Sequence, residues 1–98
     1  MPRLNFDDYD VPMHTRLAIE SYIIDGYQPG GFLTAVFAND LFAAMSRADH
    51  LNRFAMHEIC GWIYMNAPGD CWGNYEIVKE YLAQKRKELE EKMEKDNA

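Results

Sequence analysis

The sequence contains no long apolar run and no residue pattern that marks a common catalytic site. None of its stretches approaches the ~18–20 consecutive apolar residues that span a bilayer. The N-terminal stretch MPRLNFDDYD has one arginine but no continuous apolar region, so we expect no signal peptide and a cytoplasmic location. The only serines, Ser21 and Ser46, lie within helical patterns, and nothing in the sequence orients a Cys–His pair. We therefore predict a protein that is not an enzyme and does not contact a membrane.

Cysteine is also scarce, with Cys60 in a helical pattern and Cys71 in a glycine-rich loop. In a reducing cytoplasm we predict two free thiols, with a disulfide as the alternative if the loop folds back. His57 and Cys60, three residues apart, and Cys71 are conceivable metal ligands. A structural zinc site needs four good ligands, however, and HEIC is not the HExxH pair of a metalloprotease. We expect neither a metal nor a cofactor.

Positive charge is scarce in residues 1–83, which carry eleven acidic and five basic residues. Residues 84–98 contain five of each sign, so the whole net charge of −6 belongs to the first part of the chain. An acidic surface repels a phosphate backbone, and this argues against a nucleic acid polymer as partner. It is compatible with a basic surface on another protein.

An apolar content of 48% is typical of a chain that folds around a core, and 98 residues suffice for one domain. Helical spacing of the apolar residues predicts an all-α fold, a compact bundle of about four to five helices with a long charged C-terminal helix. The expected organisation is an N-terminal arm over 1–12, a helical domain over 13–83 and a charged helical extension over 84–98. Aromatic residues in the arm are expected to pin it to the body.

Turns and capping residues set the expected helix boundaries. A first helix is predicted over about 13–25, ended by Gly26, and helical spacing resumes at Phe32. The pair Asn39–Asp40 interrupts this second pattern, which we interpret as two short helices in place of one kinked helix. The segment from Asp49 to Asn66 is predicted as one long helix, apolar most of the way round and therefore buried on several sides.

The last helix is expected to begin after Asn74, whose side chain can cap it. Beyond Leu82 only Leu89 and Met93 are apolar, which predicts a solvated extension that frays at its end. A short seam in an oligomer is the alternative, because Tyr75, Leu82 and Leu89 are seven residues apart.

The turn from Pro29 to Phe32 is the first candidate site. Glycines at a helix start leave backbone N–H groups open to a phosphate or carboxylate, with the positive end of the helix dipole behind them. Tyr27 and Phe32 flank this turn and could stack on a ring. The alternative is a tight connector in which Phe32 enters the core.

The pair Asn39–Asp40 is the second candidate site, because it offers an amide and a carboxylate between two apolar helix faces. These groups can read a ligand's hydroxyl or ring edge. Alternatively, one residue caps a helix and the other is solvated.

The stretch from GYQPGGFL through AVFANDL and RAD to NAPGDCWG resembles a group of small proteins encoded by tailed bacteriophages and prophages, over about residues 14–83. Their pattern is roughly GYPPGGFL, AVLxNDL, RAD and WxYNNAPxxxWGS. Gln28 replaces a proline and should loosen the turn, while Asn74 replaces serine and keeps a capping side chain. The matching positions are Gly26, Tyr27, Pro29, Gly30, Gly31, Phe32, Leu33, Ala35, Val36, Asn39, Asp40, Leu41, Arg47, Ala48, Asp49, Asn66, Ala67, Pro68, Trp72 and Gly73.

This resemblance implies a phage accessory protein that acts in the host bacterial cytoplasm, where such proteins bind nucleotide signals or host proteins. The first hypothesis is a non-catalytic binder of a small anionic, nucleotide-type ligand, acting as a homo-oligomer and possessing anti-defence activity. The second is an inhibitor of a host protein that acts by protein–protein contact. The residues expected to bind the ligand are Tyr27, Gly30, Gly31, Phe32, Asn39, Asp40 and Arg47.

Overall fold

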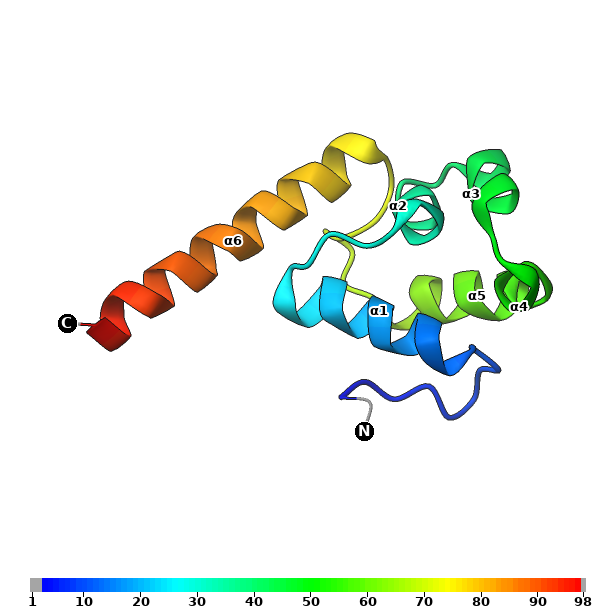
Figure 1. Cartoon of the computed structure of the whole chain (residues 1–98), viewed down its shortest axis with the longest axis horizontal. Coiled ribbons are helices and arrows are strands. Elements are labelled where there is room, and N and C mark those ends of the chain that lie inside the picture. The colour runs from blue at the N-terminus through cyan, green and yellow to red at the C-terminus, as the bar shows by residue number, and fades with distance from the viewer. Residues whose placement is uncertain (1–2, 98) are drawn as a thin grey trace.

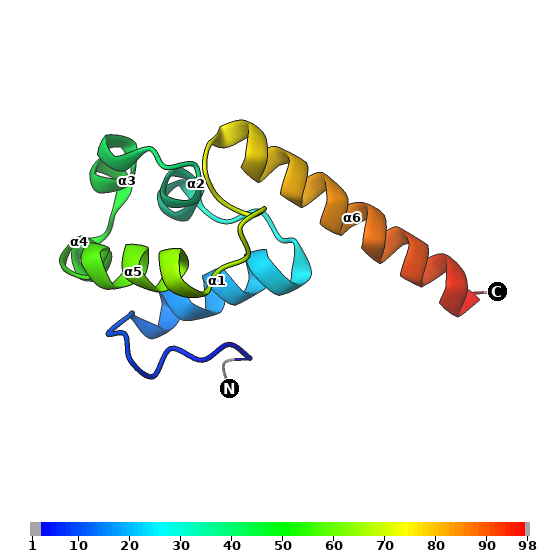
Figure 2. The ribbon, with the colours of Figure 1, turned by 180° about the vertical axis from the view of Figure 1, so that it is seen from behind.

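The structure is a computed structural model that describes residues 3–97. Within these residues it has six helices and no strand: α1 (Met13–Asp25), α2 (Gly31–Phe37), α3 (Leu41–Arg47), α4 (His50–Phe54), α5 (Met56–Asn66) and α6 (Tyr75–Asn97). Helices α1 to α5 form the body, and α6 projects far beyond it, so the molecule measures 48 × 29 × 21 Å (Figure 1). Seen from behind, α6 again projects away from α3 and α4 (Figure 2). The predicted all-α fold with a long charged C-terminal helix is confirmed.

Helix α1 has the predicted bounds and supplies much of the core through Ile19, Tyr22 and Ile23. It ends at Gly26, which has a left-handed backbone with φ of 70° and donates its N–H to the Tyr22 carbonyl. A β-carbon on Gly26 would overlap Cβ of Lys85 in α6. Gly26 therefore allows both the end of α1 and the close crossing of α6.

The pair Asn39–Asp40 separates α2 from α3, as expected for two short helices. Asn39 has φ of 62°, and its N–H donates to the Val36 carbonyl while that of Asp40 donates to the Ala35 carbonyl. These two bonds form a Schellman motif, which satisfies the last carbonyls of α2. The Asp40 side chain then accepts from the Ala43 N–H and caps α3.

The single long helix predicted from Asp49 to Asn66 is wrong. The chain breaks at Ala55 into α4 and α5, and this region is not buried on several sides, since Leu51, Phe54 and Tyr64 are exposed. A long-range contact explains the break. The buried side chain of Asn52 is hydrogen-bonded to Thr15, which fixes α4 on α1, while α5 separately buries Ile59, Trp62 and Ile63.

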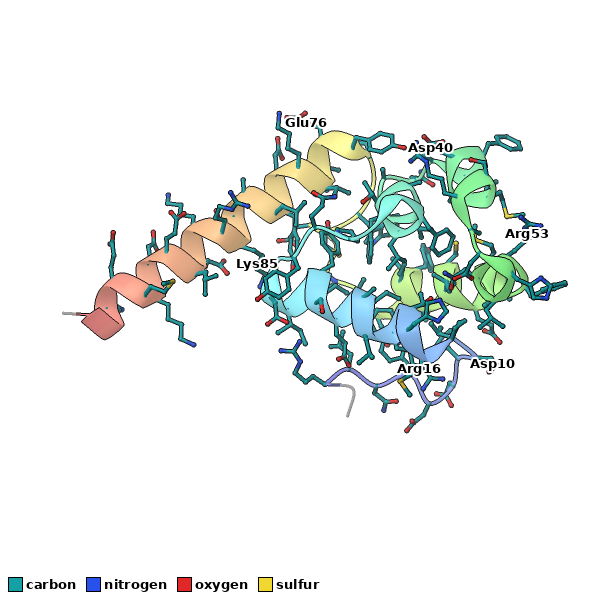
Figure 3. The ribbon with its side chains drawn as sticks, in the orientation of Figure 1. Asp10, Arg16, Asp40, Arg53, Glu76 and Lys85 are labelled. Carbon is teal, nitrogen blue, oxygen red and sulfur yellow. The ribbon has the colours of Figure 1, made fainter. Side chains whose placement is uncertain are left out.

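The N-terminal arm is part of the core. Phe6 is only 2% exposed and stacks on Trp62 with 4.4 Å between ring centroids. The indole N–H of Trp62 donates to the Asn5 carbonyl at 2.8 Å, and the buried carboxylate of Glu20 accepts from the Leu4 N–H at 2.9 Å. Arg16 reaches from α1 to the Val11 carbonyl and lies over the Phe6 ring (Figure 3).

Helix α6 begins after Asn74, whose side chain accepts from the Ile77 N–H at 2.8 Å, so the predicted cap is confirmed. Val78 and Tyr81 are buried, and the Tyr81 hydroxyl donates to the Ile23 carbonyl at 2.5 Å. Apart from Lys85, the side chains from residue 83 to residue 95 are exposed. No helix in the described part of the chain is both long and apolar enough to cross a bilayer.

Candidate functional site

The expected ligand-binding residues lie in several places. Gly30 and Gly31, at the start of α2, adjoin Arg47, the last residue of α3, and Asp40 lies between these two helices. Phe32 is half-buried and packs against the core, as the connector alternative proposed. Tyr27 and Asn39 line two separate hollows.

The turn before α2 is held by side-chain hydrogen bonds. The Thr34 hydroxyl donates to the Pro29 carbonyl at 3.1 Å, and the Gln28 amide donates to the Thr34 oxygen at 3.1 Å. We expected Gln28 to loosen this turn, and the expectation is wrong. Its amide ties the turn to α2, an interaction that a proline at this position could not make.

The fold does not require a glycine at position 30, whereas a side chain at position 31 would press against Arg47. Gly30 has φ of −64° and ψ of 174°, an extended conformation that any residue adopts. A β-carbon on Gly30 would meet no atom within 4 Å, whereas one on Gly31 would lie 3.3 Å from Cδ of Arg47. Both residues are exposed, and no hydrogen bond within residues 3–97 uses their N–H groups. The backbone is therefore open to a molecule approaching from outside.

Arg47 places a cation beside this open backbone. Its stem passes Gly31, and it makes no ion pair with the carboxylates in the described part of the chain. By contrast, Arg3 is paired with Asp25, and Arg16 is bonded to arm carbonyls. Arg47 is thus one of three cations in residues 3–83, with Arg53 and Lys79, that make no ion pair or carbonyl hydrogen bond, and it lies next to two glycine N–H groups.

Asp40 links this region to α6. Its carboxylate accepts a 2.6 Å hydrogen bond from the hydroxyl of Tyr75, the first residue of α6. Arg47 acts on the same phenol and opposes the effect of Asp40 on the Tyr75 pKa. We call Gly30, Gly31, Asp40, Arg47 and Tyr75 the turn cluster. Sequence reasoning missed Tyr75, whose only signal was its heptad spacing from Leu82, because it lies 35 residues from its partner.

The pKa of Tyr75 is raised, first because its phenol donates a hydrogen bond to the Asp40 carboxylate. Partial burial of the phenol and the negative charge of Asp40 raise the pKa further. A raised pKa in the folded state stabilises the fold below the ordinary tyrosine pKa, and this contribution is lost as the pH rises through the folded-state value. We expect Asp40→Asn to lower the Tyr75 pKa, measured by NMR titration of the tyrosine ring carbons. Tyr75→Phe identifies the signal, and an unchanged titration in Asp40→Asn would contradict the link.

Tyr27 lies away from the turn cluster, in a notch of about 320 Å³ between the end of α1 and the projecting part of α6. Ile24, Lys85, Leu89 and Lys92 also line this notch. Stacking by Tyr27 on a ligand at the glycines is therefore not supported by its position.

Asn39 lines a hollow of about 190 Å³, whose walls are mainly apolar and aromatic. The walls include Cys60, Tyr64 and Trp72. The main structural role of Asn39 is its left-handed backbone, which ends α2.

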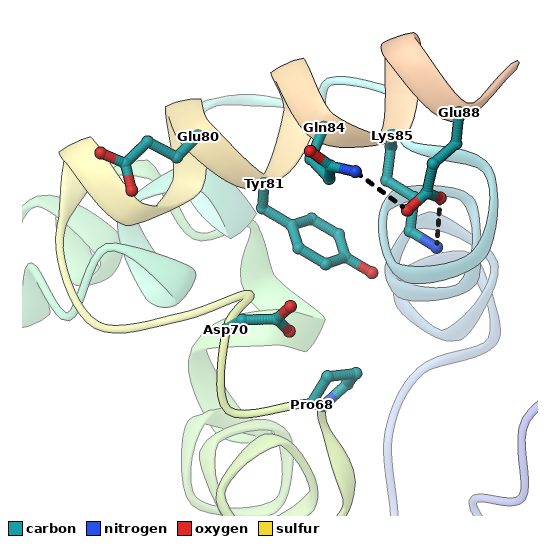
Figure 4. A pocket seen from close by; sticks show the side chains of 7 residues that line it. All are labelled: Pro68, Asp70, Glu80, Tyr81, Gln84, Lys85 and Glu88. Carbon is teal, nitrogen blue, oxygen red and sulfur yellow. Dashed lines mark hydrogen bonds and ion pairs between the residues drawn. The ribbon is translucent and has the colours of Figure 1, made fainter. Parts of the chain in front are cut away.

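A further hollow of about 450 Å³ lies between the loop after α5 and the middle of α6 (Figure 4). Asp70, Glu80 and Glu88 give it an acidic character, and Lys85 and Gln84 are both bonded to Glu88. The ring of Tyr81 points into it. Because its donors Lys85 and Gln84 are engaged by Glu88, this acidic hollow is not suited to an anion.

Both cysteines are free thiols, as predicted. Burial raises the pKa of Cys71 to about 12, with the Asp70 charge as a further cause, and burial also raises the pKa of Cys60. Among the residues that the structure describes, no three His, Cys, Asp or Glu side chains are grouped to hold a metal ion.

Comparison of the chain with protein-family models, with curated proteins and with solved structures gives no match. The chemistry of the candidate site is therefore inferred from its own groups. The turn cluster combines an unpaired guanidinium, open backbone donors, a phenol and a carboxylate on one exposed surface.

Proposed function

We propose that this protein is a non-catalytic binder of a small anionic, nucleotide-type ligand. The observation that carries the proposal is Arg47, which makes no ion pair among the described side chains, beside two exposed glycines of which Gly30 has free space for a side chain. Helix α2 has only seven residues, so its dipole adds little, and the guanidinium is the main source of attraction. Following the resemblance to phage proteins, we propose that the ligand is a host defence signal sequestered in the bacterial cytoplasm.

In this proposal a phosphate accepts hydrogen bonds from the N–H groups of Gly30 and Gly31 and pairs with Arg47. A side chain at Gly30 would occupy the space through which the phosphate approaches, although it would touch nothing in the free protein. The Asp40 carboxylate and Tyr75 hydroxyl, at the far side of Arg47, are suited to hydroxyl or ring N–H groups of the same ligand.

The test is a thermal-shift and calorimetry panel of linear and cyclic mononucleotides and dinucleotides. A ligand at 100 times its dissociation constant adds about 2.7 kcal/mol of stability, which raises the melting temperature of a domain this size by roughly 11–22 °C. We expect Gly30→Val and Arg47→Ala to abolish this shift. Gly69→Val is the matched control, because a β-carbon at Gly69 also meets no atom within 4 Å. If no nucleotide stabilises the wild-type protein, the proposal is rejected.

An inhibitor that binds a host protein is the second candidate function. It is favoured by the exposed apolar residues of α3, where Phe42 is 84% exposed and Leu41 is also exposed beside Asp40. Contiguous apolar side chains on a surface are typical of protein-binding sites. Phe42→Asp separates the two functions, because it should abolish capture of a host protein and leave a nucleotide-induced thermal shift unchanged.

A further inference from the structure

Helix α6 carries an apolar and basic face whose apolar residues Leu89 and Met93 are exposed along its projecting part. At 3.6 residues per turn, Leu82, Leu89 and Met93 share one face with the cations Lys85, Arg86 and Lys92. The acidic residues Glu90, Glu91 and Glu94 fall outside this face, while Glu88 borders it and pairs with Lys85. Among the described side chains, Arg86 and Lys92 therefore remain as the cations without an ion pair beside the exposed Leu89 and Met93.

A groove with the opposite charge lies on the body. It has a volume of about 490 Å³ and is lined mainly by apolar residues of α1, α4 and their flanks, together with the carboxylates Asp10 and Glu58 and the imidazole of His14. Its apolar residues are Pro12, Met13, Leu51, Phe54 and Ala55. Phe54 is 79% exposed, an unusual state for a phenylalanine in a folded monomer.

We infer that this groove binds helix α6 of a second copy of the chain. The groove and the projecting helix have complementary chemistry, since an apolar stripe with flanking cations fits a mainly apolar groove that contains carboxylates. They lie at opposite ends of the molecule, so one copy cannot join its own two surfaces (Figures 1 and 3).

Charge decides which surface of the second copy α6 meets. Two α6 helices paired through the Leu82–Leu89 seam would place Arg86 and Lys92 of one copy near the same cations of the other, which is unfavourable. Neither cation lies within 4 Å of a carboxylate among the side chains that the structure describes. The groove supplies the missing carboxylates through Asp10 and Glu58.

The notch beside Tyr27 provides the other half of the contact. The apolar face of α6 turns toward it, because Leu89 and Lys92 line it together with Ile24 and Tyr27. When α6 fills the groove of the second copy, the protruding Phe54 of that copy enters the notch. Each copy has both surfaces, so a pair related by a two-fold axis makes the contact twice.

The test measures self-association of the full-length protein by light scattering and analytical ultracentrifugation, over a concentration series. We expect a mass above the 11.4 kDa of one chain, with an affinity that falls as salt rises. Phe54→Glu and Leu89→Glu should each raise the dissociation constant of the dimer tenfold or more, which corresponds to about 1.4 kcal/mol of binding free energy. Both side chains are exposed in the single chain, so neither change should disturb its helix content or melting temperature.

A charge exchange makes the test specific. The Asp10→Lys variant and the Lys92→Glu variant should each be monomeric when studied alone. In either homodimer, positions 10 and 92 would carry charges of the same sign at both contacts. An equimolar mixture of the two variants should form a heterodimer, since one contact is reversed in sign and the other is wild type. Glu91→Lys, on the opposite side of α6, is the control and should associate normally.

A wild-type protein that stays monomeric at about 100 µM, where interfaces of this class are populated, overturns the inference. Association that none of these variants weakens, or a mixture that stays monomeric, also overturns it.

Discussion

Replacing Phe6 with alanine is expected to lower the free energy of unfolding by about 3–5 kcal/mol, a large part of the ~5–15 kcal/mol that stabilises a domain. The ring is buried between Trp62 and the Arg16 guanidinium, so its removal leaves a cavity at the centre of the arm's contact with the body. The hydrogen bond from Trp62 to the Asn5 carbonyl and that from the Leu4 N–H to Glu20 depend on the same seating of the arm. Urea unfolding followed by circular dichroism and tryptophan fluorescence measures the change.

Phe42→Ala is the matched control, because it removes the same ring from a site that is almost fully exposed. Its expected effect is within about 0.5 kcal/mol. If Phe6→Ala were as stable as Phe42→Ala, the arm would not belong to the core in solution. Hydrogen exchange at the Leu4 N–H, which should be slow in the wild type and fast in Phe6→Ala, gives a second readout.

Gly26→Ala is expected to destabilise the protein by about 2–4 kcal/mol, for two separable reasons. Alanine is strained at φ of 70°, and its β-carbon would overlap the Lys85 side chain where α6 crosses the end of α1. The second reason predicts that α6 shifts, so the bond between Tyr81 and the Ile23 carbonyl should weaken. Thermal and urea unfolding measure the loss.

Gly69→Ala controls for glycine replacement in general, since the site is open and should change by less than about 0.5 kcal/mol. Lys85→Gly separates the two causes, because it removes the β-carbon that the new methyl group at position 26 would strike. In a double-mutant cycle, Gly26→Ala should cost less in the Lys85→Gly background by about 1–2 kcal/mol, which is the steric part. Equal costs in both backgrounds would mean that α6 does not cross α1 at this point.

The sequence was informative wherever a local hydrogen bond decides the structure. Gly26 ends α1, the Asn39–Asp40 pair divides α2 from α3, and Asn74 caps α6, because each acts on residues within one helical turn. Such signals are readable from residue type and order alone.

The features that sequence reasoning missed depend on distant partners. Alanine is no helix breaker, and the break at Ala55 follows from the contact between Asn52 and Thr15, 37 residues away. Helical spacing also shows which residues share a face without showing what covers it. Leu51 and Phe54 therefore entered the expected core, and the structure leaves both on the surface.

The candidate site was predictable in part. The glycine turn was singled out correctly as an open stretch of backbone, and Arg47 does lie beside it. The position of Tyr27 was not foreseeable, because the path of the chain after Gly26 sends it toward α6. Whether the turn binds a nucleotide stays a prediction.

The hydroxyl of Tyr81 and the side chain of Val78 complete the core from the first turns of α6, and this has a consequence for synthesis on the ribosome. The ring of Phe6 cannot pack until Trp62 has been synthesised, and the ring of Tyr22 cannot contact Tyr81 until α6 has begun to form. The emerging chain therefore exposes apolar surface until α6 has been synthesised, a state in which nascent proteins aggregate or recruit chaperones. Translation speed through the codons for α6 should consequently influence the yield of folded protein.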